Sequence, residues 1–182
     1  MKHTLILSAL LLCLATALNA QKTYYPQTWD YDKSALGIGL GFDYGGIGVN
    51  YTVYPQENIG IFGSVGYAIA GAGYNFGVKL RANPNKFTPF FMAMYGYNAA
   101  IAVSGNTGGM NFDKLFYGPT LGGGFDLKSR GGKGYFSFAL TVPIRNQDAD
   151  NYMQELTNTY GITFANKLSP VGFSFGYRFI LY

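Results

Sequence analysis

The sequence predicts an all-β fold, namely an eight-stranded antiparallel up-and-down transmembrane β-barrel. Charged residues make up only 12% of the 182 residues, whereas proteins average about 25%. Aromatic residues reach 18% and glycine contributes 26 residues, a composition that excludes disordered chains and coiled coils. Eight segments also alternate between a large apolar residue and a small or polar one, which is the two-residue period of β-strands.

Residues 1–20 are expected to be a secretory signal peptide, because Lys2 precedes an apolar run at 5–18. That run is shorter than the roughly 20 residues that a membrane-spanning helix needs. Cleavage at residue 20 would remove Cys13 and His3, the only cysteine and the only histidine of the chain. The expected mature chain then has no disulfide, cysteine nucleophile, histidine base, or metal site built on those residues. Reading Cys13 as a lipoprotein cysteine is the weaker alternative, since the residues before it fit that signal poorly.

The first four predicted strands alternate strictly between large apolar residues and mostly glycine, serine, threonine or asparagine. They comprise residues 35–43, 47–53, 59–69 and 73–81. Their apolar faces carry, in order, Leu36, Ile38, Leu40 and Phe42; Ile47, Val49, Tyr51 and Val53; Ile59, Ile61, Val65, Tyr67 and Ile69; and Tyr74, Phe76, Val78 and Leu80.

The last four predicted strands comprise residues 87–103, 115–127, 136–145 and 172–181. The first of these is apolar on both faces, so its orientation stays open. One of its faces carries Phe91, Tyr95, Tyr97, Ile101 and Val103, and the other carries Phe90, Met92 and Met94. The other three alternate clearly. Their apolar faces carry Leu115, Tyr117, Leu121, Phe125 and Leu127; Phe136, Phe138, Leu140, Val142 and Ile144; and Phe173, Phe175, Tyr177, Phe179 and Leu181.

The residue types on these faces favour a membrane barrel over a soluble one. A soluble protein would place Lys and Glu on its outer strand faces, but here the charges are concentrated in turns and loops. In a membrane barrel the large apolar face meets lipid and the small polar face fills a narrow interior. Backbone groups in lipid must all be paired, so the strands are expected to close. A soluble lipocalin-like barrel with inverted faces remains the other possibility.

The connections between the strands fit a barrel whose two termini face the periplasm. The periplasmic turns are then residues 55–58, 82–86 and 128–133, all of them short. The outer loops are residues 44–46, 70–72, 104–114 and 146–167. The last two are long, as expected for the outer side of such barrels.

The signal peptide, the eight alternating segments and the ending GYRFILY at 176–182 resemble the small eight-stranded outer-membrane barrels of the OmpA-transmembrane-domain or OmpX type. The resemblance covers residues 35–182, and residues 21–34 are expected to form an N-terminal periplasmic leader. It implies a place in the cell outer membrane of a Gram-negative bacterium, with lipid and lipopolysaccharide as neighbours. It also implies that the barrel-assembly machinery reads the C-terminal strand.

Charged residues on the inward faces are the candidate site of the lumen. They are Asp43, Lys79, Arg81, Asp126, Arg145 and Arg178. Asp43 and Arg145 are expected near the outer end, and the other four toward the periplasmic end. An eight-stranded interior is just wide enough for its own side chains, and unpaired buried charges are costly. The favoured interpretation is an ion-pair network that fills the lumen; a narrow anion-favouring path is the alternative, because four bases outweigh two acids.

The predicted function is non-enzymatic: a structural or surface-interaction barrel with a side-chain-filled lumen. No catalytic, metal-binding or cofactor-binding residue is predicted, and the lipid A-modifying barrels depend on a histidine that the mature chain would lack. The loops 104–114 and 146–167 are candidate contacts for an extracellular partner. The second loop carries an apolar stripe at helical spacing, Tyr152, Met153, Leu156 and Tyr160. A net charge of +4 gives no sign of nucleic-acid binding. A narrow pore or a small-molecule binding or transport barrel is the alternative.

Overall fold

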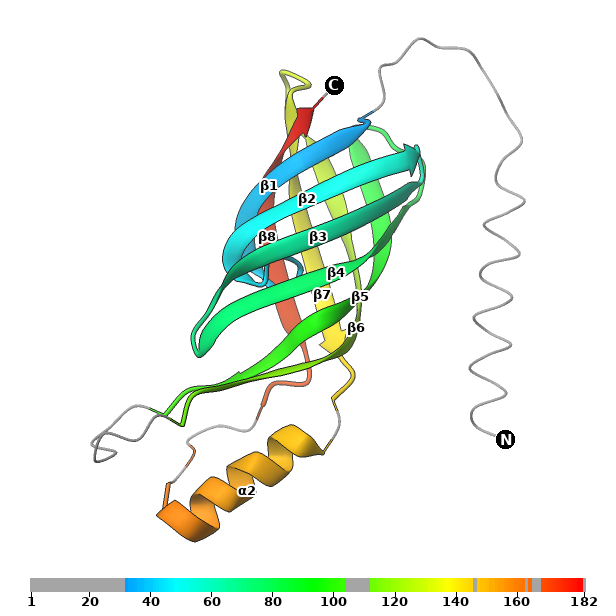
Figure 1. Ribbon diagram of the computed structural model, residues 1–182. Coiled ribbons are helices and arrows are strands. Elements are labelled where there is room, and N and C mark those ends of the chain that lie inside the picture. Colours follow the sequence, from blue (N-terminus) through cyan, green and yellow to red (C-terminus); the bar gives the residue numbers. More distant parts are fainter. Residues whose placement is uncertain (1–31, 104–111, 146, 163, 165–167, 182) are drawn as a thin grey trace, which may run out of the picture. The chain divides into compact units, whose positions relative to one another are not determined.

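The computed structural model describes residues 32–103, 112–145, 147–162, 164 and 168–181. Within them, eight strands form a closed antiparallel barrel in which each strand pairs with its neighbours in the chain and β8 pairs with β1 (Figure 1). The predicted all-β, eight-stranded, up-and-down barrel is therefore confirmed. The predicted signal peptide, residues 1–20, lies outside the described residues, as does most of the predicted leader.

The strand bounds agree with the predicted alternation to within a few residues. The strands are β1 (Ser34–Gly41), β2 (Gly46–Gln56), β3 (Ile59–Ala68), β4 (Gly71–Arg81), β5 (Phe87–Ile101), β6 (Lys114–Lys128), β7 (Gly134–Pro143) and β8 (Gly172–Leu181). A short 3-10 turn, η1 (Phe42–Tyr44), follows β1, and the helix α2 (Asp148–Tyr160) lies between β7 and β8. Among the described residues, no helix is long and apolar enough to cross a membrane.

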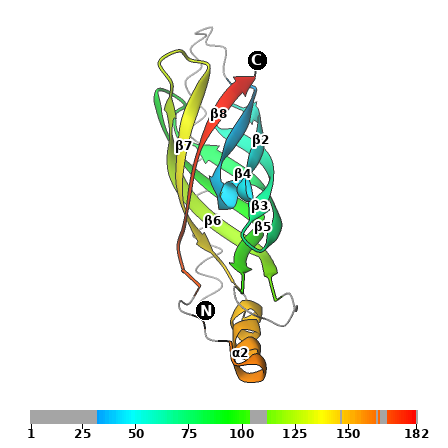
Figure 2. The ribbon, with the colours of Figure 1, turned by 90° about the vertical axis from the view of Figure 1, so that its left-hand side faces the viewer.

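The two ends of the barrel carry different parts of the chain. The end where β1 begins and β8 stops, which we call the termini end, also carries the β2–β3, β4–β5 and β6–β7 turns. The opposite end, called the loop end, carries the β3–β4 turn, the β5–β6 loop and the β7–β8 connection. Helix α2 lies beyond the strands at the loop end in both views (Figure 2).

Large apolar side chains face outward along every strand, as the alternation predicts. Ile47 and Phe91 are each 75% exposed, and Ile38 is 59% exposed. Inward positions hold mostly small or polar residues, of which Thr52 and Thr120 are fully buried. Between the strand ends, the outward positions of the described strands carry no charged side chain. The barrel therefore has an apolar outside and a largely polar inside.

The structure decides the orientation of strand β5, which the sequence left open. Phe91 and Tyr95 are exposed on the outside, whereas Met92 and Met94 between them face inward. Those inward side chains join an apolar cluster inside the barrel, made of Phe62, Phe90, Met92, Met94 and Ala139. This inner cluster explains why both faces of the segment are apolar: one covers the outside of the barrel and the other fills part of its interior.

A register shift in β5 contradicts one predicted face. The pairing with β6 slips between Tyr97 and Ala99, which is what a β-bulge produces. Beyond the slip the two faces exchange, so Ile101 is only 4% exposed although the alternation placed it on the same face as Phe91. The prediction for Ile101 is wrong because an extra residue in one strand shifts the two-residue period without changing the residue types.

The first strand ends earlier than predicted, and the chain then turns into the barrel. Phe42, predicted on the outward face, instead packs against the inner apolar cluster. Tyr44, predicted in an outer loop, is fully buried. Gly41, Gly45 and Gly46 have φ angles of 120°, 70° and 108°, a region that residues with a Cβ atom rarely adopt. The glycines therefore permit the inward turn that the alternation alone does not predict.

Candidate functional site

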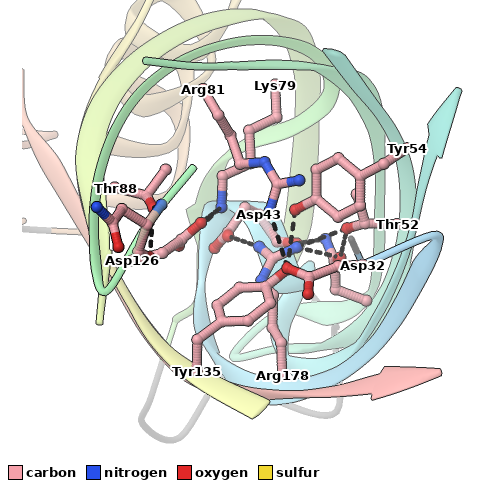
Figure 3. A network of polar contacts seen from close by, with 12 residues as sticks. Asp32, Asp43, Thr52, Tyr54, Lys79, Arg81, Thr88, Asp126, Tyr135 and Arg178 are labelled. Atoms are coloured by element: carbon pink, nitrogen blue, oxygen red, sulfur yellow. Dashed lines mark hydrogen bonds and ion pairs between the residues drawn. The ribbon is translucent and has the colours of Figure 1, made fainter. Parts of the chain in front are cut away.

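The lumen of the barrel is the candidate functional site because it gathers the buried charged side chains. Figure 3 looks along the barrel into this region and shows side chains from several strands pointing toward one another. The ion pairs of the described residues fall into three groups. Each group joins parts of the chain that are far apart in the sequence.

Arg81 of β4 and Asp32 form the first group, at the termini end (Figure 3). Arg81 Nη1 lies 3.1 Å from Asp32 Oδ2. Arg81 Nε and Nη2 donate to the carbonyl oxygen of Glu57 at 3.0 and 2.8 Å. Lys128 Nζ approaches the other oxygen of Asp32 at 3.5 Å, and the guanidinium carbon of Arg81 lies 3.6 Å from the centre of the Tyr54 ring. These contacts attach Asp32, two residues before β1, to the ends of β4 and β6.

Lys79 of β4 and Asp126 of β6 form the second group. Lys79 Nζ lies 2.8 Å from each carboxylate oxygen of Asp126, and the two side chains are 0% and 5% exposed. Lys79 Nζ also lies 3.7 Å from the centre of the Phe90 ring and 5.6 Å from that of Tyr135. A lone buried charge at this depth would be costly, and each of these two charges is compensated by the other. The pair also joins β4 to β6 inside the barrel.

Arg178 of β8 and Asp43 of η1 form the third group (Figure 3). Arg178 Nη2 donates to Asp43 Oδ2 at 2.7 Å, and Nη1 donates to Asn50 Oδ1 and Thr52 Oγ1 at 2.7 Å each. The Thr52 hydroxyl donates to Asn50 Oδ1 at 2.8 Å. All four side chains are buried. The group therefore joins the last strand, the second strand and the inward turn.

The turn η1 occupies space that glycines leave on the inner wall of the barrel. A Cβ atom on Gly39 would lie 2.7 Å from the ring of Tyr44, and one on Gly176 would meet the Tyr44 hydroxyl. The side-chain amides of Asn50 and Asn75 donate to backbone carbonyl oxygens of the turn at 2.7 and 2.6 Å. The small inward residues of the strands are thus matched to a segment of the chain that folds back into the lumen.

Arg145 lies at the loop end, apart from these three groups. Its Nε donates to the carbonyl oxygen of Asn98 at 3.2 Å, and its Nη1 donates to that of Ser169 at 2.6 Å. Burial lowers the pKa of the Arg145 guanidinium, and the carboxylate of Asp150 opposes that shift. A cavity of about 20 Å³, lined in part by Asn98 and Arg145, has room for about one water molecule.

Helix α2 packs on the β5–β6 hairpin at the loop end. Tyr152 Oη donates to the carbonyl oxygen of Phe112 at 3.0 Å, and the rings of Phe112 and Tyr160 are 4.8 Å apart. Leu156, from the predicted apolar stripe, is buried. These contacts account for the helical spacing of the stripe. The predicted loops are described only in part, because residues 104–111, 146, 163 and 165–167 lie outside the described residues.

The charged residues singled out in the sequence fall into distinct places. The structure brings Lys79 together with Asp126 and brings Arg178 together with Asp43. The alternation placed Asp43 near the outer end and Arg178 toward the other end, and the inward turn is what brings them into contact. Arg145 has its described hydrogen bonds with backbone oxygens at the loop end.

Sequence reasoning missed the partner of Arg81. That partner is Asp32, which lies two residues before β1 and within the segment predicted to be a leader. A signal was present, because Asp32 is an acidic residue directly before a strand whose start lies at the same end of the barrel as the end of β4. The backbone oxygen of Glu57, which accepts two further hydrogen bonds from Arg81, leaves no such signal.

No family model matches the chain, and a comparison with curated proteins finds no match. In the part of the chain that the structure describes, no group of three or more His, Cys, Asp or Glu residues lies close enough to hold a metal ion. The described lumen offers paired charges, side-chain amides and hydroxyls, together with one apolar cluster. Its chemistry is suited to holding strands together across a narrow interior.

Proposed function

We propose that this chain is a transmembrane β-barrel of the Gram-negative cell outer membrane. The observation that carries the proposal is the belt of large apolar side chains around the outside of the closed barrel. Soluble proteins rarely expose an apolar surface of such extent, whereas the lipid-facing side of a membrane barrel requires one. Closure adds support, because both edges of every strand are paired, as a bilayer demands. A soluble lipocalin-like barrel would need the opposite arrangement of faces.

The role that we infer is non-enzymatic: a structural or surface-interaction barrel with a lumen filled by its own residues. The three ion-pair groups, the inner apolar cluster and the inward turn support a filled lumen. The alternative of a narrow pore or a small-molecule binding barrel has less support, because the charged side chains of Asp43, Lys79 and Arg178 are almost fully buried inside the barrel.

The proposal includes an orientation and a set of partners. Residues 1–20 are the signal peptide, residues 21–34 are the periplasmic leader, and the termini end faces the periplasm. The loop end then faces the exterior and offers loops 104–114 and 146–167 to an extracellular partner. The outward faces contact outer-membrane lipid and lipopolysaccharide. Strand β8, with exposed aromatic residues along its outward face, is the signal for the barrel-assembly machinery.

Reconstitution tests the membrane assignment and the filled lumen separately. The chain from residue 21, refolded in detergent, is expected to change its gel migration on heating and to insert into lipid vesicles. In a planar bilayer it is expected to carry no steady current. Failure to insert contradicts the membrane assignment. A steady anion-selective current leaves that assignment intact and overturns the filled lumen, with Lys79, Arg81 and Arg178 as the next residues to substitute.

A further inference from the structure

Basic residues gather at the termini end of the barrel without acidic partners. Lys86 of the β4–β5 turn and Arg130 and Lys133 of the β6–β7 turn are exposed. Within the described residues, none of these three forms an ion pair. Of the acidic residues described toward this end, Asp32 and Asp126 pair with other bases, and Glu57 is exposed. The three bases therefore present uncompensated positive charge; we call them the basic rim.

The basic rim is continuous over strands β5 to β8. The carbonyl oxygen of Lys86 accepts a hydrogen bond from the backbone N–H of Lys128 at 2.9 Å, so the β4–β5 turn adjoins the end of β6. The carbonyl oxygen of Lys133 accepts one from the N–H of Ile180 at 3.0 Å, which places Lys133 beside the end of β8. Arg130 lies in the same short turn as Lys133. The β4–β5 turn, the β6–β7 turn and the end of β8 are therefore neighbours at the termini end.

The outside of the barrel next to the basic rim is aromatic. Phe87 begins β5, Phe136 lies near the start of β7 and Phe179 lies near the end of β8; they are 53%, 43% and 51% exposed. The aromatic surface continues along the strands, because the ring centre of Phe87 lies 5.3 Å from that of Phe125 and the ring centre of Phe136 lies 4.9 Å from that of Tyr177. Positive charge and apolar rings thus follow one another along the barrel axis.

We propose that the basic rim binds the phosphate headgroup of an anionic phospholipid whose acyl chains lie on the aromatic surface beside it. In such a lipid the charged headgroup is followed by apolar chains, just as the basic rim is followed by the aromatic surface along the barrel axis. Lys and Arg donate strong hydrogen bonds to phosphate oxygens, and basic residues near a membrane surface attract anionic lipid. The inference rests on the proposed membrane location and concerns the leaflet that the termini end faces.

The charge of helix α2 at the loop end differs from that of the basic rim. Helix α2 carries Asp148, Asp150 and Glu155 and no basic residue along its length. Along its length this helix therefore offers no basic side chain to an anionic headgroup. The preference for anionic phospholipid is therefore expected at the basic rim and not at α2.

Quenching of a single tryptophan by brominated lipid tests the site. Trp29→Phe removes the one tryptophan of the chain, and Phe136→Trp places a new one beside the basic rim. Protein purified from membranes is reconstituted in phosphatidylcholine vesicles that contain brominated phosphatidylglycerol or brominated phosphatidylcholine. The anionic quencher is expected to act at a lower mole fraction than the neutral one. A matched reporter, Val142→Trp at the loop end of the same strand, is expected to show no such preference.

Removal of the basic rim tests the residues. The triple variant Lys86→Gln/Arg130→Gln/Lys133→Gln is expected to reduce the preference for phosphatidylglycerol by about fivefold or more at low salt. Lys114→Gln, which removes an exposed lysine at the loop end, is the control and is expected to leave the preference unchanged. If the triple variant does not fold, Arg130→Gln alone is tested instead. The Arg130 side chain makes no described contact that folding requires, so this variant is expected to fold and to weaken the preference measurably.

The outcomes separate this proposal from the membrane assignment. Equal quenching by both lipids beside the basic rim, an equal preference at the loop end, or a preference that survives substitution of the rim overturns the lipid site. Each of these results leaves the barrel in the bilayer. Absence of quenching by either brominated lipid at both reporters instead contradicts the membrane location itself.

Discussion

The Lys79–Asp126 pair shows how single residues constrain the barrel. The two side chains are almost fully buried and come from strands β4 and β6. Removing one partner leaves the other as an uncompensated charge, whereas replacing both with apolar residues of similar size removes the charge altogether. The pair therefore contributes to stability through its coupling more than through either residue alone.

Lys79→Met is expected to lower the free energy of unfolding by about 3–5 kcal/mol, because Asp126 is left buried and unpaired. The double variant Lys79→Met/Asp126→Leu is expected to lose much less. Urea titration of the refolded barrel measures both values. Equal losses in the single and double variants would show that Asp126 does not depend on Lys79 for its compensation.

Phe138→Arg tests the lipid-facing surface at a single position. Phe138 lies on the outward face in the middle of β7, so the substitution is expected to cost about 2–4 kcal/mol in a bilayer. Val142→Arg, on the same face near the loop end of the strand, is the matched control and is expected to cost about 0–1 kcal/mol. Refolding titrations in vesicles measure the difference, and near-neutral values at both positions would place this face outside lipid.

The sequence predicts which side chains face inward wherever the alternation of apolar and polar residues is unbroken. Lys79 and Asp126 lie on the small, polar faces of their strands, and the structure buries both side chains. The partner of a charge is harder to predict, because it depends on the register between distant strands. Asp43 meets Arg178 only because the chain turns inward after β1, and no residue pattern in the strand specifies that contact.

At the scale of elements, the inward turn and the glycines around it form one unit. Gly39 faces the ring of Tyr44, whereas Gly63 on β3 faces outward with open space around it. The same substitution at the two positions therefore has different consequences. A glycine on the inner wall leaves space that another segment of the chain occupies. A glycine on the outer wall has no such neighbour, so a side chain there would displace nothing.

Gly39→Ala is expected to destabilise the barrel by about 1–3 kcal/mol, as overpacking of a filled interior does. The new Cβ atom would lie 2.5 Å from the carbonyl oxygen of Phe175 and 2.7 Å from the ring of Tyr44. Gly63→Ala is the matched control and is expected to be neutral or slightly stabilising. Thermal or urea unfolding of the two variants compares them directly. A cost at Gly63 as large as that at Gly39 would contradict a role of the turn in the difference.

The elements that the alternation predicted least well are those where the chain departs from regular pairing. The bulge in β5 reverses the face of Ile101, and the end of β1 at Gly41 sends Phe42 inward. Both departures depend on backbone geometry and not on side-chain polarity. Adjacent glycines at Gly45 and Gly46 indicate a turn in the sequence, but its direction follows from the three-dimensional arrangement.

At the scale of the whole barrel, the fold was predictable because one simple rule repeats eight times. Every predicted segment became a strand of the closed ring. The number of segments sets the size of the barrel, and that size in turn predicts an interior filled by side chains. The contents of that interior were less predictable, because Asp32 and the inward turn come from outside the regular strands.

The proposed orientation predicts which ends of the barrel are accessible from outside the cell. Asn158→Cys in α2 is expected to react with a membrane-impermeant maleimide on intact cells, because it is exposed at the loop end. Asn58→Cys in the β2–β3 turn is expected to react only after the outer membrane is permeabilised. The chain has one native cysteine, within the proposed signal peptide, so labelling is specific. The opposite result would reverse the orientation.

The contact between Arg178 and Asp43 also couples the position of the inward turn to closure of the barrel. The two residues are 135 positions apart, and Asp43 belongs to the first hairpin whereas Arg178 arrives with the last strand. Until that strand is added, β1 and β7 each keep an open edge, which is the slow and aggregation-prone stage of a sheet with distant pairings. The inward turn lies inside the ring that β8 closes, so the ion pair that holds Asp43 exists only once β8 is in place.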